Sequence, residues 1–405
     1  MKSVEEHLTG ILETVAPLAP LELQLLDAHG SLLVDDAAAT VDLPAFDNSS
    51  MDGYAVRLAD VADADERYPA VLEVIADIPA GTSSDATLEA GTCARIMTGA
   101  PIPAGTEAIV PVEWTDAGMP TVRITRAPKE GQYIRRHGDD VTTGQTVLEA
   151  GTELASAQIG LLAAIGRDRV RVRPRPRVVI LSTGSELVPP GRPLAAGQIR
   201  DSNSYMLTAA AREAGAIAYR VGNVPDDPKV LIDTIEDQLI RADAVVTTGG
   251  VSAGAYDVVK EVLSELGTVA FEKVAMQPGM PQGFGTIGPD ATPIFTLPGN
   301  PVSAFVSFEV FVRPALQKMR GTAAFDRETV RARCTKAFGS PEGKRQFVRA
   351  RLTPGTEPGR PATVEPVGGH GSHLIGSLAL ANALIVVPEG TAEVRKGSTV
   401  DVMVL

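Results

Sequence analysis

Three segments in the middle of the chain share one pattern, and this pattern limits the possible folds more than any other feature. Each is an apolar, largely β-branched run that passes directly into a loop of small polar residues and then into a helix-like periodicity; the runs are 178–182, 244–247 and 293–297. Such runs are typical of strands buried on both faces, as in a parallel sheet covered by helices. We predict a doubly wound α/β domain over residues 175–321, with helices at about 204–214, 256–266 and 302–319.

The regions on either side lack this alternation. Ser3 and Glu6 form a capping-box pattern ahead of apolar residues at helical spacing, which predicts a helix that ends before Pro17. Short β-rich runs separated by Gly, Pro and Asp follow, and they return after Gly321. We expect three parts: an N-terminal region at 1–170 (helical parts at 1–20 and 142–170, a β-rich insert at about 40–140), the central α/β domain at 175–321, and a small β domain at 325–405.

Charge and composition exclude several classes of protein. The 405 residues include 37 Lys and Arg against 50 Asp and Glu, a formal net charge of −13, which disfavours a nucleic-acid surface. The two cysteines, Cys93 and Cys334, provide neither a disulfide framework nor a cysteine zinc site, and this favours a reducing compartment. We find no signal-peptide pattern and no run of about 18 apolar residues, so we expect a cytoplasmic protein without a membrane partner.

The loops after the three predicted strands carry the clearest chemical signal. They span 181–187, 247–257 and 297–303, and they are rich in glycine and hydroxyl groups. Carboxyl ends of parallel strands lie at one edge of a sheet, where glycine-rich backbone presents N–H groups to anions. Glu186 and Asp257 could share a hydrated Mg²⁺ against a phosphate, or each could be a capping or first-turn acid of the following helix.

The usual nucleotide and metal motifs do not occur. We find no G-x-x-x-x-G-K-[ST], no G-x-G-x-x-G after a strand and no H-E-x-x-H. His370 and His373 are three residues apart in a Gly-Ser loop, which favours a plain loop over a metal site. The loops must therefore form a different kind of anion site.

Five segments, taken together and in this order, resemble the molybdopterin molybdenumtransferase family, which includes the gephyrin E domain. They are FDNSSMDGYA at 46–55, RIMTGAPIP at 95–103, STGSEL at 182–187, TGGVSAGAYD at 248–257 and LPGNPVS at 297–303. The resemblance covers nearly the whole chain. It implies a homodimer whose central domain is like the stand-alone pterin adenylyltransferases. The implied reaction takes adenylylated molybdopterin and molybdate to molybdenum cofactor and AMP with Mg²⁺, and the implied further partners are a pterin adenylyltransferase and a molybdoenzyme.

The resemblance also implies roles for particular residues. Asp52 and Thr98 would complete the site from the neighbouring subunit, and Lys273 would stabilise the pterin phosphate. Glu186, Asp226 and Asp257 would line the central pocket, with Glu186 and Asp257 as the metal ligands, and Asp140 is a further match. The residues expected to bind substrate in the three loops are Thr183, Gly184, Ser185, Gly249, Gly250, Ser252, Pro298, Pro301 and Ser303.

For molybdate, the resemblance implies oxyanion clamps in the C-terminal domain: Arg349 and Ser372, with Arg345 as a second arginine. The chain departs from the family at one loop. Gln277 and Met280 stand where the family usually has two lysines, so neutral groups or the remaining cations must bind the anions there.

Two other functions remain open from the sequence. The chain could carry out only pterin adenylylation, although this would leave the N-terminal and C-terminal motifs without a role. It could also be a non-catalytic dimeric scaffold of the gephyrin E type. The presence of Asp52, Glu186 and Asp257 favours catalysis.

Overall fold

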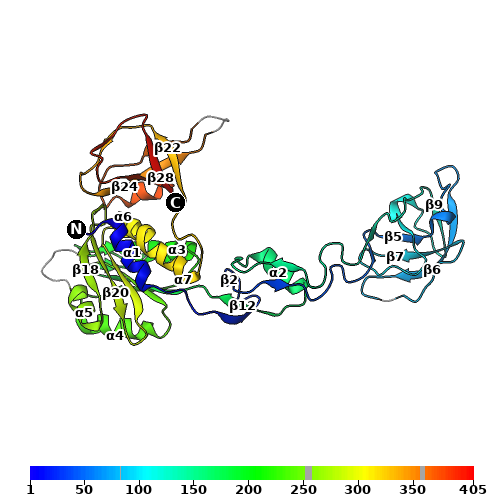
Figure 1. Cartoon of the computed structure of the whole chain (residues 1–405), viewed down its shortest axis with the longest axis horizontal. Helices are drawn as coiled ribbons and strands as arrows, with labels where there is room; N and C mark the ends of the chain where they lie inside the picture. Colours follow the sequence, from blue (N-terminus) through cyan, green and yellow to red (C-terminus); the bar gives the residue numbers. More distant parts are fainter. Residues whose placement is uncertain (83, 251–257, 356–360) are drawn as a thin grey trace. The chain divides into compact units, whose positions relative to one another are not determined.

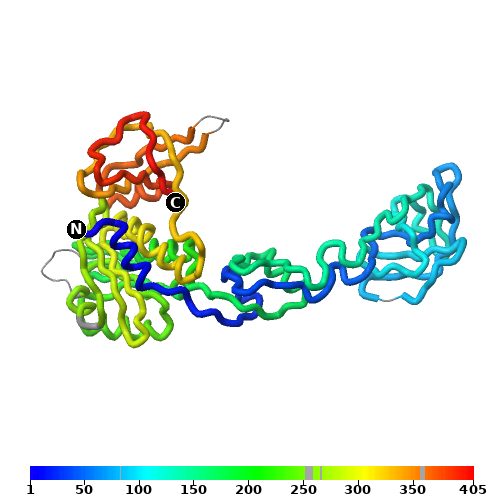
Figure 2. The backbone as a smooth tube through the Cα atoms, viewed as in Figure 1, coloured from blue at the N-terminus to red at the C-terminus, as the bar shows by residue number. Residues whose placement is uncertain are grey.

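The computed structural model describes residues 1–82, 84–250, 258–355 and 361–405. They form two compact units. The first contains Met1–Leu21, Gly30–Leu32 and Val172–Leu405, and the second contains Glu22–His29 and Leu33–Arg171 (Figures 1 and 2). The chain therefore begins in the first unit, builds the second, and returns to complete the first.

A six-stranded mixed sheet forms the centre of the first unit, in the order β16-β13-β17-β21-β20-β18. Its strands are β16 (Ile217–Val224), β13 (Arg177–Thr183), β17 (Ala244–Thr248), β21 (Thr292–Leu297), β20 (Pro281–Ile287) and β18 (Ala270–Lys273). The first four are parallel: β13, β17 and β21 are the three predicted strands, and β16 was not predicted. β20 is antiparallel to both of its neighbours, so β18 runs in the same direction as β21.

Both faces of this sheet are covered by helices, which confirms the predicted architecture. Along β13, Val178 and Ile180 pack into one core and Val179 and Leu181 into another. The first core receives α1 (Val4–Thr14), α3 (Asn203–Glu213), α6 (Pro301–Ser307) and α7 (Arg313–Arg320); the second receives α4 (Pro228–Leu239) and α5 (Val258–Leu266). Between α6 and α7 the helix has a π-helical turn, η3 (Phe308–Val312). The opening helix, expected with the N-terminal region, packs on the central sheet through Val4 and Ile11.

The C-terminal part of the first unit is a small closed β structure. Its strands follow the order β19-β24-β25-β22-β28-β26, and β24 also pairs with β26. They are β19 (Met276–Gln277), β24 (Arg345–Thr353), β25 (Thr363–Pro366), β22 (Thr329–Cys334), β28 (Thr399–Val404) and β26 (Ala383–Val387). β19 belongs to the segment between β18 and β20, so one strand of this sheet comes from the central domain. A short pair, β23 (Phe338–Gly339) with β27 (Glu393–Val394), and α8 (Ile375–Ala379) complete it.

The second unit is mostly β, as the turn-rich sequence predicts. Its main sheet has the order β8-β5-β7-β6-β9 and buries Tyr54, Val110 and Ile124 completely. The strands are β5 (Gly53–Val56), β6 (Ala70–Ile78), β7 (Thr92–Ile96), β8 (Ala108–Pro111) and β9 (Thr121–Ile124). Two smaller pairs are β4 (Asn48–Ser49) with β10 (Ile134–Arg135) and β3 (Ala37–Ala38) with β11 (Thr146–Leu148). The helix α2 (Ser156–Ala164) lies in the part predicted to be helical, 142–170.

No helix in the described parts of the chain combines the length and apolar character that a membrane crossing requires.

Candidate functional site at the carboxyl edge of the central sheet

The loops that follow β13, β17 and β21 lie side by side, because these three strands are adjacent and parallel. Several hydrogen bonds join them. The Thr183 hydroxyl donates to the carbonyl of Thr248 at 3.4 Å, and the Gly249 N–H donates to the carbonyl of Leu297 at 3.1 Å. The structure thus brings the three predicted loops to one edge of the sheet.

The loop after β13 presents an exposed acid on a glycine turn. Gly184 has φ +150°, and a Cβ added there would come within 2.6 Å of Glu186 Oε2. Glu186 is exposed, and its carboxylate has no hydrogen bond or ion pair among the described residues. The Ser185 N–H donates to Asp226 Oδ2 at 3.0 Å, and the Asp226 N–H donates to Ser185 Oγ at 3.2 Å. Asp226 therefore holds the turn, and the Glu186 carboxylate remains free for a ligand.

The loop after β17 begins with two positions whose backbone conformation favours glycine. Gly249 and Gly250 have φ values of +101° and +69°, and a Cβ at Gly249 would lie 2.5 Å from the carbonyl oxygen of Thr183. The close contact between these two loops therefore requires glycine. Two predicted residues of this loop, Ser252 and Asp257, lie outside the described residues.

The loop after β21 contacts the C-terminal domain. Pro298 is buried, Pro301 is the first residue of α6, and Ser303 is 5% exposed. Ser372 lies against this loop: the Asn300 side-chain amide donates to Ser372 Oγ at 3.0 Å, and the Val302 N–H donates to the carbonyl of Ser372 at 3.0 Å. The structure thus brings the predicted hydroxyl of the C-terminal domain to the third loop.

Lys273 reaches the same edge by a different route. It is the last residue of β18 and is opposite Pro281, the first residue of β20. Because β18 runs parallel to β21, its carboxyl end lies at the edge that carries the three loops. Lys273 is exposed, and its ammonium group has no ion pair within the described parts of the chain. The segment with Gln277 and Met280 follows directly, so the two neutral replacements lie at this edge as well.

The two arginines predicted to bind an oxyanion both have partners within the chain. Arg349 is 4% exposed, and its two terminal nitrogens donate to the carbonyls of Gly369 and Gly371. Its Nε is buried without a partner among the described residues, and burial lowers the pKa of this guanidinium. Arg345 pairs with Glu5 of α1 and with Glu389 at 3.1 Å. Arg349 therefore holds the loop before Ser372, and Arg345 joins the first helix to the C-terminal domain.

Asp52 and Thr98 lie together in the second unit. The Thr98 N–H and hydroxyl donate to Asp52 Oδ1 at 2.7 and 2.9 Å. These two bonds hold the pKa of the Asp52 carboxyl below its usual range. Asp140 is exposed, and its N–H donates to the carbonyl of Leu43 at 2.9 Å. Asp52 is therefore ionised at neutral pH, and its Oδ1 accepts both hydrogen bonds from Thr98.

The His-containing loop and the two cysteines are the other candidates from the sequence. Within the described ranges, no group of three His, Cys, Asp or Glu side chains is placed to hold a metal. The His370 ring contacts the Gln346 amide at 3.2 Å, which agrees with the prediction that it is a loop residue. Cys93 and Cys334 are buried and unpaired, and burial raises the pKa of the Cys93 thiol to about 12.

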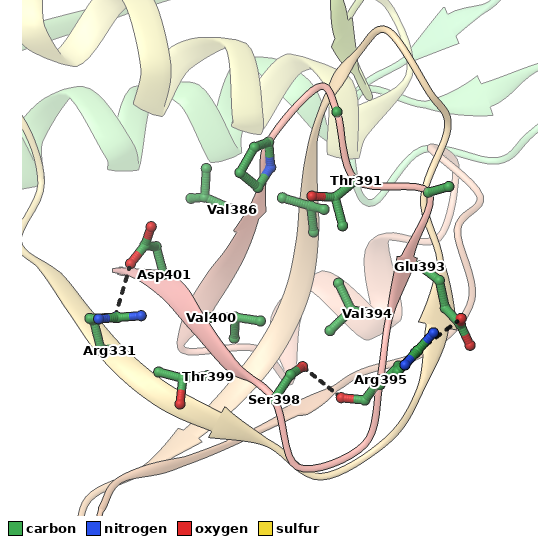
Figure 3. A pocket seen from close by; sticks show the side chains of 14 residues that line it. Arg331, Val386, Thr391, Glu393, Val394, Arg395, Ser398, Thr399, Val400 and Asp401 are labelled. Carbon is green, nitrogen blue, oxygen red and sulfur yellow. Dashed lines mark hydrogen bonds and ion pairs between the residues drawn. The ribbon is translucent and has the colours of Figure 1, made fainter.

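A separate cavity of about 630 Å³ lies on the C-terminal domain, along β26, β28 and the loop that joins them. Figure 3 shows Val386, Val394 and Val400 on its walls, with the pairs Arg331–Asp401 (3.8 Å) and Glu393–Arg395 (3.7 Å) at its rim. None of the predicted site residues lines it, so it does not belong to the site at the sheet edge.

Sequence reasoning missed three polar residues that organise the edge: Thr248, Asn203 and Asn300. Asn203 comes directly before the predicted helix at 204–214, where a polar residue is expected as a cap. Its neighbours in the sequence do not show whether Asn203 only caps the helix or, as in the structure, bonds Thr248 and Gly299.

Comparison with known proteins covers the whole chain. Three family models match in order: the MoeA N-terminal region (domains I and II) at residues 2–166, a probable molybdopterin-binding domain at 179–318, and the MoeA C-terminal region (domain IV) at 331–405. Molybdopterin molybdenumtransferase 2 of Mycobacterium tuberculosis is 46% identical over 408 residues, which is 99% of each chain. Molybdopterin molybdenumtransferase of a Nostoc species is 39% identical over 415 residues, covering 100% of this chain and 94% of the relative.

Solved structures agree with these matches. A molybdopterin biosynthesis MoeA protein from Pyrococcus horikoshii has a TM-score of 0.73 at 30% identity, with 99% of this chain and 98% of the solved chain covered. A second structure from that organism has a TM-score of 0.70 at 28% identity over 100% of both chains. With three domain models in family order and full-length relatives above 30% identity, the chain belongs to the molybdopterin molybdenumtransferase (MoeA) family.

Proposed function

We propose that this protein is a molybdopterin molybdenumtransferase, which uses adenylylated molybdopterin and molybdate and releases AMP. The observation that carries the proposal is the full-length correspondence with enzymes of that name. The edge of the central sheet supports it, because a phosphoanhydride needs backbone N–H donors and a counter-cation before it can be cleaved. Alternatives that involve only the central domain leave the matches at 2–166 and 331–405 without a role.

Glu186 is the described residue that fits a divalent cation. Its carboxylate is exposed, free of ion pairs among the described residues, and next to the Gly184 turn. Mg²⁺ prefers one or two carboxylates together with phosphate oxygens and water, so we propose that Glu186 and Asp257 hold it against the substrate phosphates. The ion would neutralise charge on the phosphoanhydride. Thr183, Gly184, Ser185, Gly249, Gly250 and Ser252 would contact the same phosphates.

Lys273 is our candidate for the pterin phosphate, because its ammonium group is exposed at the carboxyl edge. For molybdate we propose Ser372 together with the unpaired Nε of Arg349, near Pro298, Pro301 and Ser303. Gln277 and Met280 add no charge there. Neutral donors, together with Lys273 and Arg349, would therefore bind the oxyanions at this edge.

We propose further that the central domain shares its fold with the stand-alone pterin adenylyltransferases and that the protein is a homodimer. In the homodimer, Asp52 and Thr98 of one subunit would complete the site of the other. Both cysteines are unpaired, which suits a reducing cytoplasm. A pterin adenylyltransferase would supply the substrate and a molybdoenzyme would receive the product.

The test is AMP release from adenylylated molybdopterin, measured with and without molybdate and with and without Mg²⁺. We expect release that depends on both. Pyrophosphate production from ATP and molybdopterin, without molybdate-dependent AMP release, would instead indicate an adenylyltransferase. Neither product above background would indicate a scaffold.

A further inference from the structure

Asn203 and Thr248 form a buried hydrogen-bond chain beneath the third loop. Asn203 Nδ2 donates to the Gly299 carbonyl at 2.7 Å and to Thr248 Oγ1 at 3.0 Å, and Thr248 Oγ1 donates to the Pro298 carbonyl at 3.0 Å. Asn203 is 9% exposed and Thr248 is 1% exposed. A carbonyl can only accept, so the atom that faces Gly299 must be the amide nitrogen, and every proton in this chain of bonds is assigned.

These bonds determine the direction of two peptide groups. In a trans peptide the N–H points opposite to the C=O of the same unit, and both peptides are trans. Because the carbonyls of Pro298 and Gly299 both face inward, the N–H groups of Gly299 and Asn300 both face outward. Neither N–H has a hydrogen-bond partner among the described residues, and both residues are exposed. Two adjacent N–H groups that point the same way form an anion-binding nest.

Two further observations indicate a ligand here. Asn203 Oδ1 is buried and has no hydrogen-bond partner among the described residues, and a buried polar atom of this kind is usually satisfied by a water, an ion or a ligand. The ideal Cβ position of Gly299 lies 3.6 Å from the Cα of Gly249, so the nest is next to the loop after β17.

We propose that Asn203 and Thr248 are positioning residues that orient the Gly299 and Asn300 N–H groups onto a phosphate oxygen of the nucleotide-linked substrate. This inference rests on the proposed function. The two side chains do not touch the substrate phosphate; they act through the backbone of the third loop. Removal of one bond frees a carbonyl to turn outward, and an outward carbonyl repels an anion.

Thr248→Val and Asn203→Asp test the proposal, since each keeps the side-chain shape and removes the donors. We expect kcat/KM for adenylylated molybdopterin to fall about 10- to 100-fold in both, less than the roughly 100- to 1000-fold for complete loss of an oriented donor, because the N–H is misdirected and not removed. The KM for molybdate should stay within about twofold of the wild type. Thr248→Ser keeps the hydroxyl and should restore most of the lost kcat/KM. Asn382→Ala is the matched control, because Asn382 also bonds backbone, at Leu352, away from the site.

A second measurement is independent of turnover. Calorimetric titration with AMP and Mg²⁺ should show weaker binding in Thr248→Val and Asn203→Asp than in Thr248→Ser and the wild type. Wild-type kcat/KM and AMP affinity in either donor-free variant would overturn the proposal, as would equal losses in Thr248→Ser. A change confined to the KM for molybdate would overturn the assignment to phosphate. If the wild type releases no AMP, the proposed function fails, and the AMP titration still decides this inference.

Discussion

Glu186, in the loop after β13, and Asp226, in the loop between β16 and α4, both lie beside Ser185 but have different environments. Asp226 exchanges two hydrogen bonds with Ser185, and Glu186 has no side-chain partner among the described residues. An unpaired carboxylate on a glycine turn can accept a metal without first breaking an ion pair. This difference supports the metal role proposed for Glu186 and indicates that Asp226 shapes the loop.

We expect Glu186→Gln to lower kcat for AMP release by at least about 100-fold, because the amide loses the charge that holds the cation against the phosphates. Its melting temperature should match the wild type, since the carboxylate is exposed and unpaired. AMP release assayed across a Mg²⁺ titration measures the effect. Glu66→Gln, an exposed glutamate of the second unit, is the control. A Glu186→Gln enzyme with an unchanged rate and Mg²⁺ requirement would refute the metal assignment.

At the scale of elements, α1 is attached to the central domain through a buried histidine. His7 is 5% exposed; its Nδ1 lies 3.4 Å from Glu272 Oε2, and its ring packs edge-on against Phe311 at 4.8 Å. Glu272 also pairs with Lys2 at 2.7 Å. Burial lowers the pKa of His7 below its usual 6.5, although Glu272 opposes this shift.

This lowered pKa predicts acid sensitivity. Below pH 6.5 the unfolded chain takes up a proton at His7 while the folded chain does not, so the free energy of unfolding falls as pH falls towards the folded pKa. The slope from one such group is at most about 1.4 kcal/mol per pH unit. Urea unfolding at pH 7.5 and 5.5 gives the free energy of unfolding at each pH. The difference between the two values should be smaller in His7→Gln than in the wild type. His29→Gln, at an exposed histidine, should keep the wild-type difference. Equal pH dependence in all three proteins would contradict the prediction.

The π-helical turn η3 supports a second connection between elements. Glu309 in η3 is fully buried as a side chain and accepts from Arg327 Nε at 2.8 Å, just before β22 begins. We expect Glu309→Gln to lower the free energy of unfolding by about 3 kcal/mol, because it leaves the charge of the partly buried Arg327 guanidinium uncompensated. Asp401→Asn removes the exposed pair with Arg331 at 3.8 Å and should cost less than about 0.5 kcal/mol. Chemical denaturation of both variants measures the two losses in the free energy of unfolding. Similar losses in Glu309→Gln and Asp401→Asn would contradict the prediction.

At the scale of the whole molecule, the predicted site residues are divided between two compact units. Asp52 and Thr98 belong to the second unit, and Glu186, Lys273 and Ser372 belong to the first. Under the proposed homodimer, each unit contributes its share to a site with the partner subunit. If a site is completed between subunits, a variant that is defective in one unit can be rescued by a partner subunit that is defective only in the other.

We therefore expect Asp52→Ala and Glu186→Ala proteins, each inactive alone, to regain activity when mixed under conditions that exchange subunits. With free exchange, half of the dimers are mixed and each has one intact site, so AMP release should reach about a quarter of the wild-type rate. Exchange is checked with differently tagged subunits. Exchange without any recovery would indicate that each site lies within one chain.

Local sequence patterns were enough to predict several strands and helices, although β16 and α4 were not among them. The capping box of Ser3 and Glu6 is present at α1, and the three apolar runs are the adjacent parallel strands β13, β17 and β21. Apolar periodicity and capping depend on residues a few positions apart, so one strand or helix is enough to specify them. The five motifs likewise identified the family from short segments.

The tertiary structure decided what depends on distant pairing. The antiparallel β20 turns β18 so that Lys273 reaches the edge of the three loops, and this cannot be seen in either strand alone. Arg345 pairs with Glu5, some 340 residues away, instead of being free for an anion. Asn203 bonds the loop after β21, although its sequence position indicates only a helix start. In each case the packing of distant parts of the chain determines the neighbour of the side chain. The charge and hydrogen-bonding capacity of a residue do not by themselves specify which distant residue will lie beside it.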